Sequence, residues 1–298
     1  MSAANQSLTC FEDSIATDQL DRAGFTFRHK LLGHPSLSLE NLGRVLPTLP
    51  KNQVMFSKTS LANGDDFETT FRSRPRGHSI EETIETIRNS ASYIMVQSPE
   101  VDPSFADLHK QLKADVETLM RRRGIGGEAL SAKLYLFIAS PNAITPFHID
   151  RYSTILMQFS GNKTVTVFPQ WDDRVVSAPN REAYVDYQRT QLPWSEDIDS
   201  LGHAFHFSPG DSLHIPFVAG HHVKNGSDDV SISMSIIFNT EESMMWRRAI
   251  CFNHHMRKRL AALGMQPAPV GNTAWRDQAR SGMYRVGEKM RRVLGRAS

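Results

Sequence analysis

The chain has 298 residues, of which 40% are hydrophobic and 22% charged, and its formal net charge is +2. This balance is typical of a soluble globular protein that buries a large core. The N-terminal residues lack the basic start and apolar run of a signal peptide, and no stretch approaches the roughly 20 apolar residues that span a bilayer. We therefore expect a cytoplasmic protein with no membrane contact.

The cysteine content and the charge distribution further limit the class of protein and the kinds of site that it can contain. Cys10 and Cys251 lie far apart and lack Cys or His partners at zinc-ligand spacing, which argues against a disulfide framework and a thiolate zinc site. Residues 246–298 hold twelve Lys and Arg and two acidic residues, a balance of +10, so the remainder carries −8. Such a basic region is compatible with nucleic acid or an acidic partner, but solvated outer faces of helices are the favoured explanation.

The first 124 residues indicate a mixture of short helices and strands. Proline, glycine and capping residues mark the boundaries of the expected elements. In chain order we expect an extended segment at 24–28, a helix from Ser38 to Leu46, an extended segment at 53–57, a turn at 63–66, a helix from the capping box Ser79–Glu82 to about Asn89, a strand at 93–97, and a helix opened by Ser104 and Asp107 and stopped at Gly124.

From residue 133 the pattern changes to short strands separated by turns, without the alternating helices of a parallel sheet. Eight such strands predict a double-sheet jelly roll. The candidates are 133–140, 144–150, 153–159, 163–168, 204–207, 211–216, 220–224 and 229–238. Residues 169–202 show little periodicity and are expected to form a long loop, which is usually functional or mobile.

Two amphipathic helices are expected at the C-terminal end. Asn239 and Glu242 form a plausible cap for the first, which ends at Gly264, and the second follows a proline-containing turn. The apolar stripes are Met245, Ala249, Phe252, Met256 and Leu263 on the first helix, and Trp275, Ala279, Met283, Val286, Met290 and Val293 on the second. These faces must pack on the barrel, on each other or on a second subunit. We therefore divide the chain into a domain at 1–240 and a helical appendage at 241–298.

A metal-binding pattern occurs within the predicted strands. His148 and Asp150 are two residues apart, so on a strand their side chains point to the same face. A histidine from a distant strand would complete a two-His, one-carboxylate triad, which leaves coordination positions on Fe(II) open. His221 and His222 are the candidates. Neighbours on a strand point to opposite faces, so periodicity does not choose between them.

The ordered segments 134–139, 145–150, 163–169 and 209–221 resemble the cupin-type Jumonji-C oxygenases, and most of all the branch that includes the asparaginyl hydroxylase acting on hypoxia-inducible factor. The resemblance covers residues 80–240. It implies a mainly β, α+β protein built on a double-stranded β-helix. It also implies an oxygenase that depends on Fe(II), 2-oxoglutarate and O2 and releases succinate and CO2. Hydroxylation of a protein or peptide side chain, or of an amino-acid-like molecule, is the expected reaction. N-demethylation is the same chemistry on an N-methyl carbon.

The resemblance also assigns roles to individual residues. His148, Asp150 and His221 would bind the metal, because the first histidine of the pair is the ligand in the similar hydroxylases. His222 would point elsewhere, and His214 is a lesser candidate with a second-shell or core role. The expected cosubstrate-binding residues are Lys163, Thr145, Tyr93, Thr154 and Ser235. The last two stand where the resembled hydroxylase has asparagines, and their smaller hydroxyl groups can still donate hydrogen bonds.

Two further expectations concern partners and an alternative function. The resembled hydroxylases dimerise through C-terminal helices, so we expect a homodimer, although the apolar stripes could instead dock on the barrel of the same chain. The alternative function is a non-catalytic, metal-binding cupin-like module that is either regulatory or in contact with nucleic acid. A complete triad together with Lys163 argues against it, because a binding module needs neither open metal positions nor a buried cation.

Overall fold

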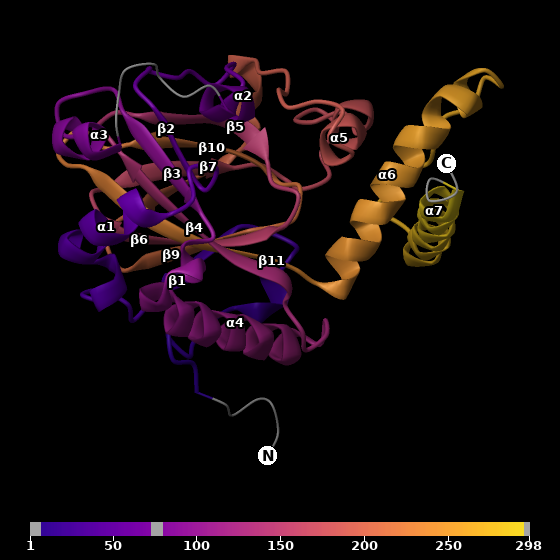
Figure 1. The fold of residues 1–298 in the computed structure, drawn as a ribbon. Coiled ribbons are helices and arrows are strands. Elements are labelled where there is room, and N and C mark those ends of the chain that lie inside the picture. The colour runs from indigo at the N-terminus through magenta and orange to yellow at the C-terminus, as the bar shows by residue number, and fades with distance from the viewer. Residues whose placement is uncertain (1–6, 73–79, 295–298) are drawn as a thin grey trace.

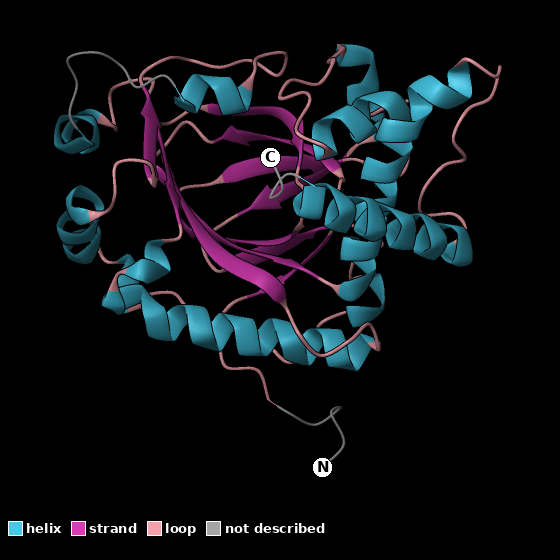
Figure 2. Cartoon of the chain, turned by 45° about the vertical axis from the view of Figure 1, so that its right-hand side comes forward, coloured by secondary structure: helices cyan, strands magenta, loops and turns pink. Residues whose placement is uncertain are grey.

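The computed structural model describes residues 7–72 and 80–294, which form two antiparallel β-sheets with helices around them (Figures 1 and 2). The strands are β1 (Phe25–Arg28), β2 (Val54–Ser57), β3 (Tyr93–Gln97), β4 (Leu130–Ala139), β5 (Ile144–Ile149), β6 (Ser153–Ser160), β7 (Lys163–Val167), β8 (His203–Phe207), β9 (Asp211–Ile215), β10 (Gly220–Asn225) and β11 (Ser231–Asn239). The α-helices are α1 (Leu39–Val45), α2 (Phe67–Arg72), α3 (Ile80–Thr86), α4 (Pro103–Arg123), α5 (Ala178–Val185), α6 (Glu241–Ala261) and α7 (Ala274–Leu294).

The two sheets face each other, as the jelly-roll prediction requires. The larger has the strand order β1-β9-β6-β11-β4-β3-β2 and the smaller the order β5-β10-β7-β8. Leu156 of β6 and Leu213 of β9 share one buried cluster with Val165 of β7 and Val223 of β10, so side chains of both sheets fill the space between them. The predicted mainly β double-stranded β-helix with flanking helices is therefore confirmed.

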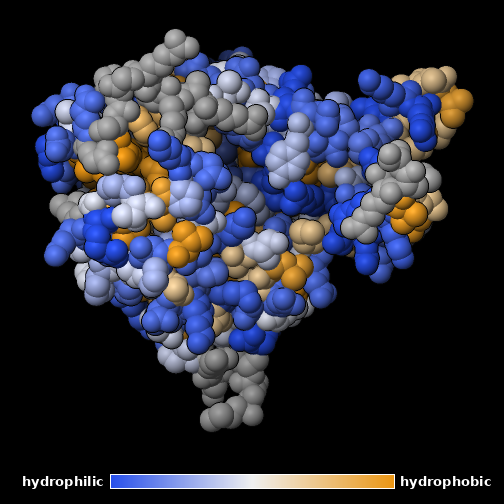
Figure 3. Space-filling view, viewed as in Figure 1, coloured by the Kyte–Doolittle hydropathy of each residue, from blue (hydrophilic) through white to orange (hydrophobic). Residues whose placement is uncertain are grey.

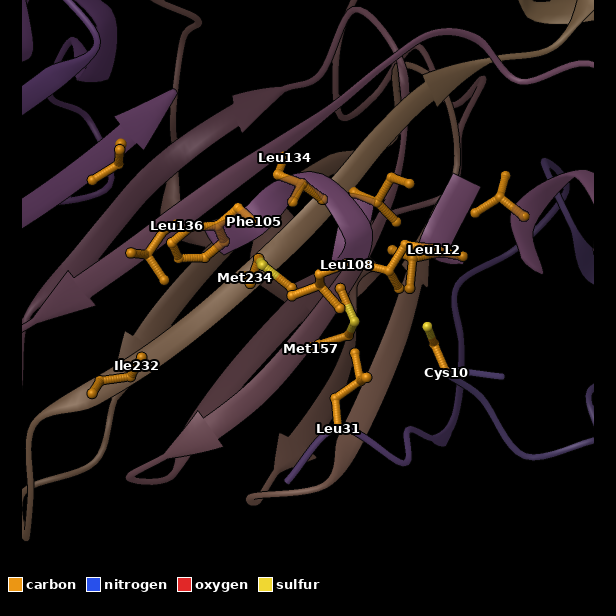
Figure 4. Packing of buried hydrophobic residues seen from close by; sticks show 14 of the residues in the cluster. Cys10, Leu31, Phe105, Leu108, Leu112, Leu134, Leu136, Met157, Ile232 and Met234 are labelled. Atoms are coloured by element: carbon orange, nitrogen blue, oxygen red, sulfur yellow. The ribbon is translucent and has the colours of Figure 1, made fainter. Parts of the chain in front are cut away.

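The main hydrophobic core lies between α4 and the larger sheet. Phe105, Leu108 and Leu112 of α4 are fully buried against Leu136 of β4 and Met234 of β11 (Figure 4). The helix was expected to be opened by Ser104 and Asp107, but the N-cap is the Asp102 carboxylate, which accepts from the Ser104 amide at 2.9 Å. Its other end is closed by Gly124 in a left-handed conformation, as predicted.

The remaining N-terminal elements lie close to their predicted positions. Ser38 caps α1 by accepting from the Asn41 amide at 3.1 Å, and the strand expected at 93–97 is β3. The predicted capping box of α3 includes Ser79, which lies outside the described residues. No helix in the described part of the chain has the length and apolar character needed to cross a membrane.

The segment 169–202 differs from the prediction, because it contains α5 and a 3-10 helix at Glu196–Leu201. The buried face of α5 includes two charged residues, which obscured the apolar periodicity in the sequence. Arg181 pairs with Asp173 at 3.1 Å, and Glu182 accepts two hydrogen bonds from Arg257 of α6 at 2.6 and 2.7 Å. Paired charges can be buried in this way because each partner replaces the water that the other loses.

The C-terminal helices exist as predicted, but the details of their packing differ. The cap of α6 is Thr240, which exchanges hydrogen bonds with Ser243, and not the predicted pair of Asn239 and Glu242. The buried face of α6 centres on Trp246, Ala249 and Ile250, which is one position away from the predicted stripe. Because Trp246 packs against Trp171 and Phe217, α6 rotates to bring this large ring inward.

Helix α7 turns its polar face toward α6 and its apolar stripe outward. Asp277 and Ser281 are buried, and the Asp277 carboxylate accepts from the Gly271 amide at 2.9 Å. The exposed apolar residues, all more than half exposed, are Trp275, Met283, Val286, Met290 and Val293. Figure 3 shows apolar side chains on the outer end of this helical pair, away from the barrel. The stripe therefore does not dock on the barrel of its own chain.

A buried carboxylate connects three parts of the fold. Asp21, which precedes β1 and is fully buried, accepts from the Ser153 hydroxyl at 2.5 Å and from the Thr240 hydroxyl at 3.4 Å. Its backbone amide donates to Nε2 of His214 at 3.0 Å, while Nδ1 of His214 donates to the Thr154 carbonyl at 3.1 Å. The histidine predicted as a lesser metal candidate thus has both ring nitrogens engaged in the core.

Replacing Asp21 by alanine should lower the free energy of unfolding by about 3 kcal/mol or more, because the Ser153 and Thr240 hydroxyls would lose a buried partner. Urea unfolding monitored by circular dichroism measures this change. The exposed Asp18 provides the matched control, since Asp18→Ala should change stability by less than about 0.5 kcal/mol. Equal effects of the two substitutions would contradict a bracing role for Asp21.

Candidate metal and cosubstrate site

Three predicted metal ligands meet at one end of the smaller sheet. His148 lies on β5, Asp150 follows that strand directly, and His221 lies on β10, paired with His148 across the sheet. One nitrogen or oxygen atom from each residue lies within 4.8 Å of the other two. Nε2 of His148 is 4.0 Å from one Asp150 oxygen, and Nε2 of His221 is 3.9 Å from the other.

The donor set fits a divalent cation. Nδ1 of His148 lies 2.7 Å from the Pro146 carbonyl, and Nδ1 of His221 lies 3.1 Å from the Ala219 carbonyl. A carbonyl only accepts, so each Nδ1 carries the proton and each Nε2 keeps a lone pair for a metal. Because the three donor atoms lie within 4.8 Å of one another, one point lies no more than about 2.8 Å from each of them, and small side-chain movements would bring all three to the about 2.0–2.2 Å of metal bonds to N and O.

Electrostatics also favour the neutral form of the buried histidine. Burial lowers the pKa of His221 to about 4, with the neighbouring His148 adding to the effect. The rings of these histidines are 4.2 Å apart, and Phe67 of α2 stacks on His148 at 5.1 Å. No pattern in the sequence indicates Phe67 as part of the site.

His222 points away from the triad. Its Nε2 lies 2.8 Å from a carboxylate oxygen of Asp199, and its ring packs edge-on against Trp194. This places it on the opposite face of β10, among the residues of the 169–202 segment. Of the two histidines that periodicity left open, the structure brings His221 to the other ligands.

All eight predicted site residues line one cavity of about 310 Å³ between the sheets. Lys163 on β7 is buried there, and its ammonium donates to the Ser233 hydroxyl at 2.8 Å. Burial lowers the pKa of Lys163 to about 7. Within the described residues no carboxylate forms an ion pair with it. A carboxylate ligand entering the cavity would supply that missing charge.

The other predicted cosubstrate residues have differing contacts. Thr145 donates to the Tyr93 hydroxyl at 3.1 Å, so these two polar groups lie together near the triad. Burial raises the pKa of Tyr93, which therefore stays protonated. Thr154 donates at 2.8 Å to the Asp150 carboxylate, so in this structure it holds a predicted metal ligand. Ser235 is buried in the cavity wall, on the same face of β11 as Ser233.

Several residues of the cavity were not predicted from the sequence. Ser233 could have been found, because Ser231, Ser233 and Ser235 alternate with apolar residues along one strand. Five of the six tyrosines of the chain line this cavity, namely Tyr93, Tyr135, Tyr152, Tyr184 and Tyr187, and only the first was predicted. Arg151 and Glu68 also line it. The tyrosines come from four separate segments, and no spacing in the sequence connects them.

Comparison with solved structures gives low-identity likenesses. YcfD, a ribosomal oxygenase from Escherichia coli in complex with cobalt and 2-oxoglutarate, is 13% identical, with a TM-score of 0.46 over 85% of this chain and 57% of that one. A second structure of E. coli YcfD is 12% identical, with a TM-score of 0.47 over 90% of this chain and 62% of that one. This chain thus spans less than two thirds of the length of those proteins. No curated protein matches its sequence.

A family comparison covers the region that forms the site. The cupin-like domain family matches residues 40–244, which is more than half of the chain. The matched region extends from α1 to the start of α6 and includes every residue of the triad. The facing antiparallel sheets are the architecture expected of such a domain. The chain therefore belongs to the cupin-like domain family.

Proposed function

We propose that this protein is an Fe(II)- and 2-oxoglutarate-dependent oxygenase. The observation that carries the proposal is the pairing, in one cavity, of a two-His, one-carboxylate cluster with a buried lysine that has no carboxylate partner among the described residues. A three-ligand cluster leaves positions open on an octahedral ion, and the lysine matches the far carboxylate of a keto diacid. The resemblance to Jumonji-C hydroxylases agrees with this assignment.

Different residues of the chain would bind the metal and the cosubstrate. His148, Asp150 and His221 would hold the metal through three bonds, with Thr154 fixing the Asp150 carboxylate. Lys163 would bind the distal carboxylate of 2-oxoglutarate, with the Thr145 and Tyr93 hydroxyls and Ser235 lining the same space. The bound iron and cosubstrate would supply oxidation of a C–H bond by O2, with release of succinate and CO2.

The substrate would enter beside the metal, where tyrosines surround the cavity. We infer that the reaction is hydroxylation of a protein or peptide side chain or of an amino-acid-like molecule, as in the branch that the sequence resembles. The apolar walls, which include Met55, Met95 and Phe137, would exclude water from the reacting carbon.

His148→Ala and Asp150→Ala should abolish tight metal binding, because each removes one of three ligands and leaves the others misaligned. Calorimetric titration with Mn2+ and assay of succinate measure the two losses. His221→Ala should have the same effect, whereas His222→Ala, on the opposite face of β10, should weaken metal binding less than threefold. The reverse order for these two histidine variants would refute the assignment.

Binding of 2-oxoglutarate should depend on pH through Lys163. Below pH 7 its amine is already protonated; above pH 7 the carboxylate must recruit a proton as it binds. The dissociation constant should therefore rise by about tenfold per pH unit above 7, until the cosubstrate-bound pKa is reached.

Lys163→Ala should remove this pH dependence and weaken 2-oxoglutarate binding at pH 7 by roughly thirtyfold, the equivalent of about 2 kcal/mol. Calorimetry with Mn2+-loaded protein measures both effects, and metal affinity should change little. The exposed Lys133 on β4 serves as the control position. Unchanged cosubstrate binding in Lys163→Ala would remove Lys163 from the site.

We also propose that residues 241–298 form a dimerisation appendage to the domain at 1–240. The apolar stripe of α7 is exposed and continuous, and two copies packed around a twofold axis would cover it. Val286→Glu with Met290→Glu should convert a dimer into a monomer in light scattering while the barrel stays folded. Val101→Glu, at an equally exposed valine outside the stripe, should leave the mass unchanged. A wild-type monomer at micromolar concentration would contradict the proposal.

A further inference from the structure

Arg151, the residue after the metal ligand Asp150, occupies an unusual position in the cavity wall. It is 9% exposed and its guanidinium lies between two tyrosine rings, 4.2 Å from that of Tyr184 and 4.1 Å from that of Tyr187. Its Nε donates to the Tyr184 carbonyl at 2.9 Å, and its Nη1 donates to the Glu68 carboxylate at 2.6 Å. Two rings and two hydrogen bonds therefore fix the plane of the guanidinium.

The third nitrogen of this fixed cation differs from Nε and Nη1 in its contacts. Nη2 of Arg151 is buried and has no hydrogen-bond acceptor among the described residues. A guanidinium stays charged at any physiological pH, and a buried charged donor without an acceptor is costly. An oxygen atom of a ligand in the cavity, which Arg151 lines, would satisfy it.

The neighbouring Tyr187 covers the second face of the Arg151 guanidinium. Tyr187 has a φ of 59°, in the left-handed region that bulky residues rarely adopt, and is 61% exposed. Arg247 donates to its hydroxyl at 3.1 Å, which holds the ring over Arg151. The positive φ belongs to the C-terminal cap of α5, because the amides of Tyr187 and Gln188 donate to the carbonyls of Tyr184 and Ala183 at 3.1 and 2.8 Å.

The charge of Glu68 determines which kind of oxygen the Arg151 guanidinium can donate to. Its carboxylate already neutralises Arg151, so a second carboxylate at Nη2 would meet like charge a few ångströms away. An uncharged carbonyl has no such penalty. Because Glu68 is itself an acceptor beside the donor, the pair also offers a place for an N–H next to that carbonyl.

We propose that Arg151 and Glu68 form the specificity-determining pair of this site and bind an uncharged amide group of the substrate, with its C=O on Arg151 and its N–H toward Glu68. The inference rests on the proposed oxygenase function, since it names the substrate class of that same cavity. It places the amide beside Asp150, so the oxidised carbon would lie within a few bonds of it.

The test compares isosteric amides and carboxylates as ligands. Wild-type protein is first loaded with Mn2+ and with 2-oxoglutarate, so that Lys163 is already bound to a carboxylate. It is then titrated with three amides, butyramide, hexanamide and phenylacetamide, and with the matching carboxylates, butyrate, hexanoate and phenylacetate. Binding is measured as the rise in Tm with ligand concentration. We expect at least one amide to bind tenfold or more tightly than its carboxylate.

Variants then separate recognition from a structural role. Arg151→Gln should weaken binding of the preferred amide at least tenfold, and Glu68→Gln should reduce the amide preference to less than threefold by removing the repelling charge. Arg151→Lys replaces Arg151→Gln if the latter does not fold. Arg174→Gln, at an exposed arginine outside the cavity, should behave as wild type. A merely structural pair would change stability without changing the preference.

Equal or tighter binding of the carboxylates, binding of neither class, or an amide preference that survives Glu68→Gln would each overturn the inference. Failure of the proposed function gives a different result. In that case Mn2+ and 2-oxoglutarate themselves produce no rise in Tm, and the amide preference is decided on metal-free protein with the same ligands.

Discussion

The site depends on the antiparallel pairing of β5 with β10. Their register sets His148 opposite His221, although 73 positions separate them along the chain. A shift of one residue would turn one of the two side chains to the other face, where His222 now pairs with Asp199. The backbone ladder therefore determines which histidines can share an ion, and the carbonyls of Pro146 and Ala219 then fix which nitrogen of each ring is available.

The arrangement of charge around this pairing is uneven. One end of the cavity holds Lys163, a cation without a carboxylate among the described residues, and the other holds Arg151, which Glu68 already neutralises. The first end is therefore suited to a charged ligand and the second to a neutral one. A cavity with this distribution of charge would orient the two ligands proposed above, the cosubstrate and the substrate amide, without a separate pocket for each.

The features that could be predicted from the sequence depend on neighbouring residues, and those that could not depend on contacts between segments far apart in the chain. The period-two spacing of His148 and Asp150 and the turn signals between strands are local, so strand positions and two ligands were predicted from the residues themselves. The third predicted ligand and the predicted cosubstrate-binding residues came from the resemblance. Helix α5 was missed because its buried face carries Arg181 and Glu182, whose partners Asp173 and Arg257 become apparent only in the fold. The orientation of α6 and the tyrosine cluster were unpredictable for the same reason: they depend on contacts between distant segments.

The position of Asp21 determines how much of the chain is needed to support the triad. Its carboxylate contacts Ser153, one residue before the threonine that holds Asp150, and the Phe217 amide at 3.4 Å, four residues before His221. The family match begins at residue 40, beyond both Asp21 and the edge strand β1. A fragment trimmed to the matched region would keep every triad residue. It would still lose the hydrogen bonds by which Asp21 supports the segments that carry the triad. In this protein, the folded unit that supports the triad is therefore longer at its N-terminal side than the region matched to its family.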